Sequence, residues 1–334
     1  MVILAILGGV ALLGLNYYNG CQEAPGGDRD VTVVVPEGTT GNDVIGLLAD
    51  EGMIKCELVA KWVVRQRDLS GQFVARTYTL NTNMDLDAVL STLTTPPPPP
   101  PEMVRFIVPE GLTMAQIAEK AEEELGIDAK TFLKLAEADD KYELDPYLPA
   151  SNLGLEGVLF PVGYDFRKDT KVTAKKLIAA MLDQFEEEVA DLPWSNAKKL
   201  GVTPYEAIII ASLIEEETAV AEERELVSAV IYNRLADGEV LGIDASNLYA
   251  DPTPEDGMLT DADLAADYPY NLRINAGLPP TPIANPGLAS LEAALKPADV
   301  TYKYYVLCPQ DGDGVHRFAD TFDQHNANVA ECLG

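Results

Sequence analysis

The sequence predicts an α+β protein with an N-terminal apolar helix, a small α+β unit and a larger mixed α/β domain built around a buried central helix. Three observations lead to this prediction. The first 18 residues are almost wholly apolar and carry no charge. The phrase V-P-E-G-x-T occurs twice, each time between a strand-like run and a helix-like run. A continuous apolar run over residues 207–214 follows a strong helix-start signal.

The overall composition excludes some classes of function. The chain has 334 residues, of which 47% are hydrophobic, so it can bury sizeable cores in two or three domains. Its formal net charge is −30. Nucleic-acid binding requires clustered Lys and Arg, so nucleic acid is not an expected partner. An anionic membrane surface would repel so acidic a chain, and any membrane attachment is therefore expected to be hydrophobic.

The N-terminal run predicts a membrane anchor over residues 1–19. As a helix, its 18 residues would measure about 27 Å, close to the thickness of a bilayer core. A basic segment and a small-x-small cleavage site are both missing, which disfavours a cleaved signal peptide. Residues 18–20, Tyr-Asn-Gly, also disfavour a lipoprotein cysteine at Cys21. We expect a retained single-pass helix with its natural N-terminus upstream of Met1.

The cysteines and histidines do not form a metal motif. The four cysteines are Cys21, Cys56, Cys308 and Cys332, none of them in a C-x-x-C pair, and the chain has only two histidines. A structural zinc site is therefore not expected. Cys308 and Cys332 form a disulfide if the bulk of the chain is extracytoplasmic; otherwise they are buried thiols.

A compact α+β unit is predicted over residues 31–95, after a Gly/Asp/Pro-rich linker at residues 20–30. A β-branched strand at 31–38 is followed by helices at 42–52 and 57–67, a strand at 73–80 and a helix at 86–93.

The second V-P-E-G-x-T phrase, at residues 108–113, opens a second strand–helix module that we place at 103–150. Six consecutive prolines lie between the two modules and form a linker at 96–102. As a polyproline II rod they would span about 19 Å, either as a spacer or as a ligand for a partner. Two copies are too few for a solenoid. The motif-rich remainder, 151–334, is predicted to be one domain.

The central helix is predicted from its start signal. Thr203 and Glu206 have the spacing of a capping box, and Pro204 occupies the tolerated first helical position. The apolar run at 207–214 is apolar nearly all round, so this helix is expected to be buried on most sides. Three glutamates, Glu215 to Glu217, follow this run.

Helical spacing distinguishes Glu217 from the other two glutamates. It continues an apolar stripe formed by Ile210, Leu213 and Ile214. Glu215 falls on the opposite side and Glu216 at the margin. Burial would raise the pKa of Glu217, as a general acid requires near neutral pH. Because the stripe is short and the helix is apolar on several faces, the pattern by itself favours the plainer interpretation of three carboxylates on the exposed end of a helix.

Several motifs together carry a resemblance to a known family. Residues 210–224, I-A-S-L-I-E-E-E-T-A-V-A-E-E-R, and 230–235, V-I-Y-N-R-L, resemble the signature of the YceG-like endolytic murein transglycosylases. L-E-G-V-L-F-P at 155–161, G-L-P-P-T-P-I-A-N-P-G at 277–287, H-R-F at 316–318 and His325-Asn326 agree in type and order. The resemblance extends over residues 31–329.

The resemblance implies a membrane span with the bulk of the chain outside, a LysM-like unit at 31–95 and a catalytic domain at 151–334. It implies action on peptidoglycan glycan strands and termination of nascent strands. Peptidoglycan synthases are the protein partners that it suggests. The sequence contains no Gly-rich phosphate loop, H-E-x-x-H motif or nucleophile elbow, so no cofactor is expected. The family's catalytic glutamate is the last one before the threonine, which is Glu217 here.

Two loops depart from the family pattern, because Gly242 stands where a Gln is usual and Val162 where an Asp is usual. Both changes put the substrate contacts of these loops in doubt. The remaining substrate-binding or supporting candidates are Glu156, Tyr164, Glu216, Asn233, Arg234, Asp244 and Tyr249. The Pro-rich loop at 277–287 is expected to be stiff and to wall the groove.

The expected reaction needs one carboxylate. Glu217 would protonate the glycosidic oxygen between MurNAc and GlcNAc, and then accept the proton of the MurNAc C6 hydroxyl as that oxygen attacks C1. Glu156 and Asp244 are candidates to stabilise the positive charge or to hold the sugar; Asn233 and Arg234 would brace the site, and Tyr249 would stack on a ring. The alternatives are a catalytically weak cell-wall-binding scaffold and a hydrolase with a second carboxylate that activates water.

Overall fold

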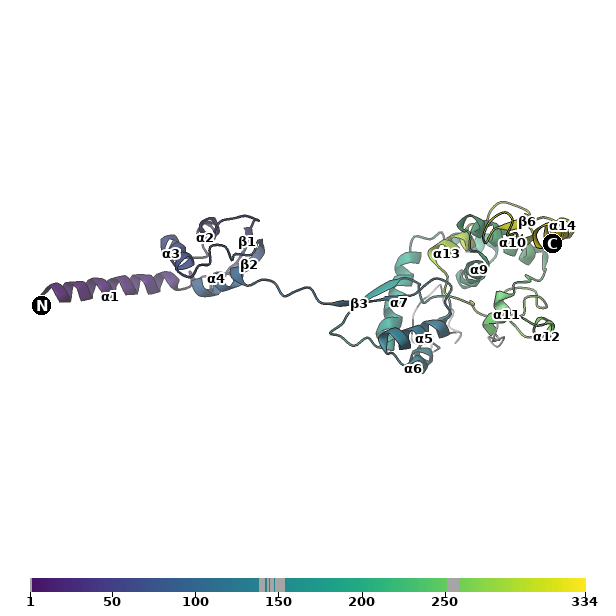
Figure 1. Ribbon diagram of the computed structural model, residues 1–334, viewed down its shortest axis with the longest axis horizontal. Helices are drawn as coiled ribbons and strands as arrows, with labels where there is room; N and C mark the ends of the chain where they lie inside the picture. The colour runs from purple at the N-terminus through teal and green to yellow at the C-terminus, as the bar shows by residue number, and fades with distance from the viewer. Residues whose placement is uncertain (1, 138–141, 143, 145–146, 148–153, 251–258) are drawn as a thin grey trace. The chain divides into compact units, whose positions relative to one another are not determined.

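The computed structural model describes residues 2–137, 142, 144, 147, 154–250 and 259–334, with side chains from residue 9 onward (Figure 1). The chain divides into two compact units, residues 1–100 and 101–334, and each is described by itself. The predicted boundary at 150/151 lies outside the described residues.

The first unit begins with helix α1 (Val2–Gln22). Its described side chains from Val10 to Tyr17 are exposed, including those of Leu12, Leu13 and Leu15. Among the helices of the described residues, none combines the length and the apolar character that a bilayer crossing requires. The transmembrane anchor therefore stays a prediction.

The rest of this unit has the element order that the sequence predicted: β1 (Asp30–Val35), α2 (Gly41–Asp50), α3 (Glu57–Gln66), β2 (Arg76–Asn81) and α4 (Leu86–Thr94). Strands β1 and β2 pair antiparallel, with Val33 opposite Tyr78. Alternate valines of β1 point inward, onto a core that the three helices close. The likeness of this unit to a LysM domain remains a prediction.

The two V-P-E-G-x-T phrases have the same local structure. Thr40 caps α2 by accepting the N–H of Asp43, and Thr113 caps α5 (Met114–Leu125) by accepting the N–H of Gln116. Gly38 and Gly111 both have a positive φ, of 78° and 82°, at which glycine is unstrained. Each phrase is therefore a strand exit, a tight turn and a helix start.

The second unit is rich in helices and has two antiparallel strand pairs among its described residues. Strand β3 (Met103–Ile107) pairs with β4 (Gly163–Arg167), and β5 (Tyr304–Leu307) pairs with β6 (His316–Ala319). The remaining elements are α6 (Ala129–Ala136), α7 (Ala174–Val189), α8 (Ser195–Leu200), α9 (Pro204–Glu217), η2 (Ala221–Glu223), α10 (Arg224–Asp237), α11 (Ala245–Ala250), α12 (Asp261–Ala265), α13 (Leu288–Leu295) and α14 (Phe322–Leu333).

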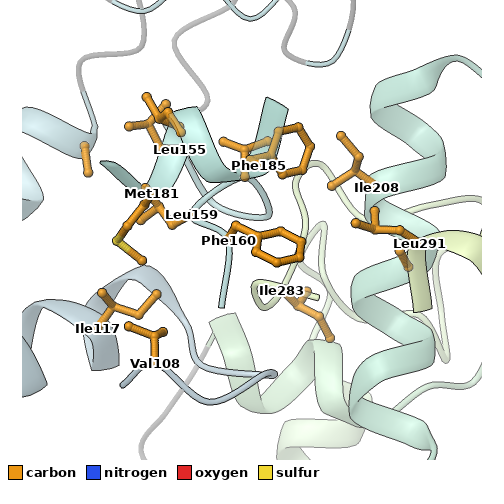
Figure 2. Close-up of a cluster of buried hydrophobic side chains, with 14 of the residues drawn as sticks. Val108, Ile117, Leu155, Leu159, Phe160, Met181, Phe185, Ile208, Ile283 and Leu291 are labelled. Atoms are coloured by element: carbon orange, nitrogen blue, oxygen red, sulfur yellow. The ribbon is translucent and has the colours of Figure 1, made fainter. Parts of the chain in front are cut away.

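One large core holds the second unit together. Side chains from the β3–α5 module, from the segment around Phe160, from α7 and from α9 meet in it (Figure 2). Phe185 of α7 and Ile208 of α9 are almost fully buried there. Helices α10 and α13 flank α9, so the predicted central helix is at the centre of this unit.

Both pairs of cysteines form disulfides. Cys308 is bonded to Cys332, which joins the segment after β5 to the end of α14. The second bond, between Cys21 and Cys56, was not predicted from the sequence. It links the end of α1 to the residue that precedes α3.

Candidate active site

The last turn of helix α9 carries the three glutamates. The helix begins with the predicted capping box of Thr203 and Glu206, with Pro204 in the first turn, and every residue from Ala207 to Ile214 is buried. At its C-terminal end the Thr218 hydroxyl donates to the carbonyl of Ile214 at 2.5 Å. Because the helix is anchored along its whole length, the position of its last turn is rigidly set.

The three glutamates point to different places. Glu215 accepts the backbone N–H of Gly287 at 3.0 Å and lies 3.9 Å from the Arg224 guanidinium. Glu216 is exposed and lines a small pocket of about 170 Å³ that includes Tyr249. Glu217 lines a cleft of about 580 Å³.

The carboxylate of Glu217 is held by one hydrogen bond, in which the Tyr305 hydroxyl of β5 donates to its Oε2 at 2.8 Å. Burial raises the pKa of Glu217 above its usual value, and this is the largest influence on it. The Tyr305 bond and the His316 ring oppose that rise, whereas the negative charge of Asp244 adds to it. These influences favour a protonated Glu217, as a general acid requires.

The cleft around Glu217 is polar and aromatic, although Glu217 continues an apolar stripe on its helix. Its lining is Glu217, Arg234, Val240, Leu241, Gly242, Asp244, Arg273, Lys303, Tyr304, Tyr305, Phe322 and His325. Four segments far apart in sequence contribute: the end of α9, α10 with the loop after it, the segment between α12 and α13 that carries Arg273, and the β5–α14 region. Charged side chains collect here because the loops that carry them meet beside the end of one helix.

Two arginines organise the cleft. Arg273 forms a bidentate pair with Asp244, at 2.5 and 2.7 Å. Arg234 donates to the carbonyl of Leu241 at 2.6 Å, and its guanidinium lies 4.9 Å from the ring centre of Tyr304. Among the predicted residues, Glu217, Arg234 and Asp244 are therefore brought together.

The predicted departure at Gly242 has a backbone explanation. Gly242 has a φ of +68°, and its N–H donates to the carbonyl of Leu272 at 2.7 Å. A side chain at this position would be strained in the left-handed region. Val162, the other departure, does not line this cleft: it packs against the core, and its carbonyl accepts the N–H of Val108.

Glu156 lies in the interior rather than in the cleft. It is 3% exposed and accepts hydrogen bonds from the Met114 N–H, the Asn285 amide at 2.7 Å and the Tyr249 hydroxyl at 3.2 Å. Burial raises the pKa of Glu156 to about 7, although these bonds oppose the rise. It therefore ties the start of α5 to the 277–287 loop.

The 277–287 loop packs into the domain and contributes nothing to the lining of the larger cleft. Asn285 accepts the N–H groups of Gly157 and Leu159, and Ile283 donates its N–H to Ser212 of α9. The stiff loop therefore braces α9 from behind, whereas the sequence led us to expect a wall of the groove.

Two further predicted residues have local partners. Tyr164 is buried and donates its hydroxyl to the carbonyl of Phe160. Asn233 donates to the carbonyls of Val300 and Tyr302, at 3.0 and 2.9 Å, just before β5. Asn233 thereby holds the strand that carries Tyr305.

No role was predicted for Tyr305, Arg273 or Lys303, and His325 was noted only as part of a family motif. The His325 ring stacks on Tyr304, with ring centres 5.4 Å apart, and both burial and the Arg234 charge lower its pKa. The signal that could have pointed to this segment is its three tyrosines within four residues, 302–305.

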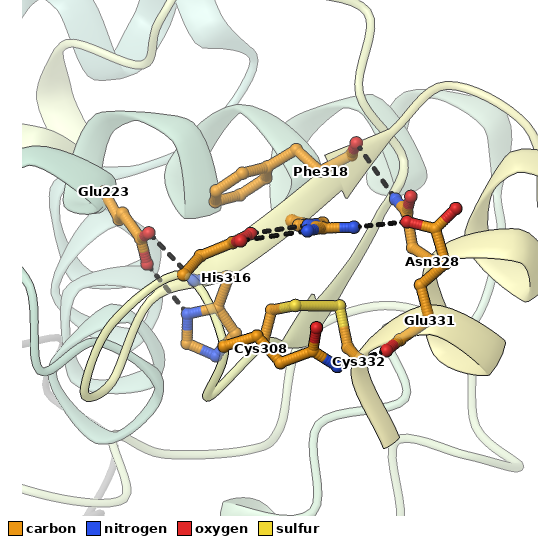
Figure 3. Close-up of a disulfide and its surroundings, with 10 residues drawn as sticks. Glu223, Cys308, His316, Phe318, Asn328, Glu331 and Cys332 are labelled. Carbon is orange, nitrogen blue, oxygen red and sulfur yellow. Dashed lines mark hydrogen bonds and ion pairs between the residues drawn. A yellow bond between two sulfur atoms is a disulfide. The ribbon is translucent and has the colours of Figure 1, made fainter. Parts of the chain in front are cut away.

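A buried carboxylate–imidazole pair lies next to Tyr305. Glu223 accepts both the backbone N–H of His316, at 2.9 Å, and its ring Nδ1, at 2.8 Å (Figure 3). The His316 ring makes an edge contact with Tyr305, with centroids 5.3 Å apart. The Cys308–Cys332 disulfide lies beside this pair and closes the same region. No cluster of three or more potential metal ligands occurs in the described ranges.

Comparison with known proteins agrees with this architecture. The family model of the YceG-like family matches residues 33–331. The chain belongs to the YceG-like family. An endolytic murein transglycosylase of Bacillus subtilis (strain 168) is 32% identical over 332 residues, which cover 96% of this chain and 89% of the relative.

Two further relatives support the membership. An endolytic murein transglycosylase of Streptococcus pneumoniae (strain R6) is 29% identical over 90% of this chain, and the match covers 58% of that longer protein. A YceG-like protein from Listeria monocytogenes has a solved structure that aligns with a TM-score of 0.58 and 27% identity, over 90% of this chain and 99% of that one. The family resemblance predicted from the motifs is confirmed, as is an α+β fold.

Proposed function

We propose that this chain is an endolytic murein transglycosylase, a lyase, in which Glu217 is the acid and the base. The Bacillus subtilis relative, which matches 96% of this chain, is an endolytic murein transglycosylase, and the YceG-like family model matches residues 33–331. The observation that supports the role of Glu217 is its place: a carboxyl with a raised pKa, at the rigid end of α9, facing a cleft and held by Tyr305.

In the proposed reaction, Glu217 donates its proton to the glycosidic oxygen that joins C1 of MurNAc to GlcNAc. The C1–O bond breaks, and positive charge develops on the MurNAc ring. The Glu217 carboxylate then takes the proton of the MurNAc C6 hydroxyl, whose oxygen forms the new bond to C1. The products are a 1,6-anhydro-MurNAc end and a free GlcNAc hydroxyl, and no water is consumed.

The rest of the cleft supports this step by charge and position. A positioned acid/base contributes about 10²–10⁴-fold, so positioning and electrostatics must supply the remainder. The Tyr305 bond stabilises the carboxylate that exists after the first proton transfer. Asp244 is the second carboxylate of the cleft, and its negative charge favours a developing oxocarbenium ion.

A hydrolase would need a second carboxylate that is free to activate water. Asp244 is the residue that favours this second candidate, because it shares the cleft with Glu217. Both of its oxygens, however, accept hydrogen bonds from Arg273. With both oxygens engaged by Arg273, Asp244 is not free to hold an attacking water, and we therefore favour the lyase.

The deciding experiment is mass spectrometry of the products from uncrosslinked glycan strands incubated with the full chain in detergent. Anhydro-MurNAc ends that disappear with Glu217→Gln are expected. Reducing ends would identify the hydrolase instead. Failure of the folded wild-type chain to cleave would overturn the enzyme, and a cell-wall-binding scaffold would then be the better description.

We also propose that α1 is a single-pass membrane anchor and that the rest of the chain is extracytoplasmic. The exposed apolar side chains of α1 favour a lipid environment. Both disulfides favour an oxidising compartment. Action on nascent strands and contact with peptidoglycan synthases, with a LysM-like unit next to the membrane, are parts of the same proposal.

A further inference from the structure

The first unit has a cationic segment in an otherwise strongly acidic chain. Residues 55–67 contain four basic residues (Lys55, Lys61, Arg65 and Arg67) and one acidic residue (Glu57), a net charge of 4 − 1 = +3 against −30 for the whole chain. Thirteen residues therefore carry a charge opposite to that of the molecule.

Two of these cations, Lys61 and Arg65, share one face of α3 with large exposed apolar side chains. Leu58, Lys61, Trp62 and Arg65 follow the i, i+3, i+4, i+7 spacing of a single helix face. Leu58 is 83% exposed and Trp62 is 52% exposed. The buried residues of the helix, Ala60, Val63 and Val64, lie on the opposite side. An exposed helix face of aromatic, aliphatic and basic residues is typical of helices that lie at a lipid interface.

Three contacts hold this face next to the end of α1. The Cys21–Cys56 disulfide joins the last turn of α1 to the residue before α3, with a Cα–Cα distance of 5.3 Å. The Tyr18 ring meets the Trp62 ring edge-on, with centres 5.7 Å apart. Lys55 pairs with Glu23 at 3.1 Å. The position of α3 relative to α1 is therefore set covalently and by packing (Figure 1).

The depth of α3 in a membrane follows from these contacts. Tyr17 and Tyr18 end the apolar stretch of α1, and tyrosines at the end of a span lie at the level of the lipid headgroups. Trp62 touches Tyr18 and therefore lies at the same level. Arg65 is one turn further along the same face and has no ion pair among the described residues, whereas Lys61 pairs with Glu57 at 2.5 Å.

We propose that the Leu58–Lys61–Trp62–Arg65 face of α3 lies on the outer surface of the membrane and binds anionic lipid headgroups. This inference rests on the proposed anchoring by α1. Leu58 and Trp62 enter the headgroup region, while Lys61 and Arg65 contact phosphate groups. Basic side chains near an anionic leaflet are attracted to it. The disulfide makes α1 and α3 a single membrane-contacting element, which limits how far the first unit can tilt from the bilayer.

The test uses Trp62 as a reporter of depth. The chain has two tryptophans, so the full-length Trp194→Phe chain fluoresces from Trp62 alone. It is reconstituted into phosphatidylcholine vesicles that contain phosphatidylglycerol and lipids brominated at defined positions of the acyl chain. We expect quenching of Trp62 that is strongest with bromines near the headgroup. If Trp194→Phe lowers the yield of folded protein, the Trp62 signal is obtained instead by subtracting the fluorescence of the Trp62→Phe chain from that of wild type.

Flotation of the vesicles is measured first, and it separates the two proposals. A chain that does not float would overturn the anchor, and this inference with it. A chain that floats with unquenched Trp62 would overturn only the contact by α3. Lys61→Gln/Arg65→Gln should reduce the quenching in vesicles that contain phosphatidylglycerol. Lys198→Gln/Lys199→Gln, an equal charge change on the second unit, should not. Equal quenching in all three chains would overturn the recognition of anionic lipid.

Discussion

The hydroxyl of Tyr305 donates a 2.8 Å hydrogen bond to Oε2 of Glu217, across 88 residues of sequence. Helix α9 and strand β5 meet at this bond. Because a hydrogen bond to a carboxylate favours its ionised form, Tyr305 lowers the pKa of Glu217 while burial raises it. The acidity of Glu217 is therefore a balance between these two influences.

Removing the Tyr305 hydroxyl should shift the pH dependence of cleavage upward. Tyr305→Phe keeps the ring and loses the donor, so the pKa of Glu217 rises further and the acid stays protonated to higher pH. A hydrogen bond to a charged group contributes about 1.5–3 kcal/mol, so we expect a loss of about 10–100-fold in kcat. The descending limb of kcat/KM against pH is the measurement; an unshifted limb would show that the bond has no influence on the acid.

Asp244→Asn should shift the same limb in the opposite direction. The negative charge of Asp244 raises the pKa of Glu217, so its removal lowers that pKa and the acid loses its proton at lower pH. In this variant Arg273 also loses its carboxylate partner, and its positive charge lowers the pKa of Glu217 further. The two variants are a matched pair, and shifts of the same sign would contradict this account of the cleft.

Glu217→Gln should abolish cleavage and leave the fold intact. An amide cannot supply the proton, so a loss of about 10²–10⁴-fold or more is expected. Its carbonyl oxygen can still accept the Tyr305 bond. Since the folded-state pKa of Glu217 is raised, its ionisation destabilises the folded chain as pH rises above about 4.5. Thermal unfolding should therefore show the variant gaining stability relative to wild type from pH 4 to pH 8.

Glu156→Gln should destabilise the fold in a pH-dependent way. The folded pKa of about 7 lies above the ordinary value of 4.5, so the folded chain holds the proton that the unfolded chain releases. The stability this provides is fully present below pH 4.5 and is lost as pH rises to about 7, on the order of 3 kcal/mol in total. The difference in unfolding free energy between the two chains should be larger at pH 4 than at pH 8. A difference that does not vary with pH would mean that folding leaves the pKa of Glu156 unchanged.

Loss of the Cys308–Cys332 disulfide should weaken substrate binding. Closing a loop of this length stabilises a fold by about 3 kcal/mol in the chain-entropy description. The bond also holds α14, which supplies Phe322 and His325 to the cleft. Cys308→Ser/Cys332→Ser should lower the Tm and raise KM more than it lowers kcat. Cys21→Ser/Cys56→Ser is the control, because it breaks a bond of the other unit. Equal KM values in both variants would rule out a role for α14 in binding.

Local signals in the sequence were sufficient for several elements and for distinguishing Glu217 as the candidate acid. The capping box at Thr203, the apolar run of α9 and the repeated V-P-E-G-x-T turns depend on residues a few positions apart. Strand β1, helices α2 to α4 and the start of α9 could be predicted for that reason. Helical periodicity also separated Glu217 from Glu215 and Glu216, since the direction of a side chain on a helix depends only on its position.

The partners of those residues were decided by tertiary structure. Glu156 and Asp244 looked alike in sequence, yet one is buried beneath the 277–287 loop and the other is paired with Arg273 in the cleft. Tyr305 reaches Glu217, and Cys21 reaches Cys56, through contacts between distant segments. No periodicity encodes such contacts, because they depend on how whole elements pack. The sequence by itself thus determined which residue could be an acid, and the fold determined which groups set its pKa and shape its cleft.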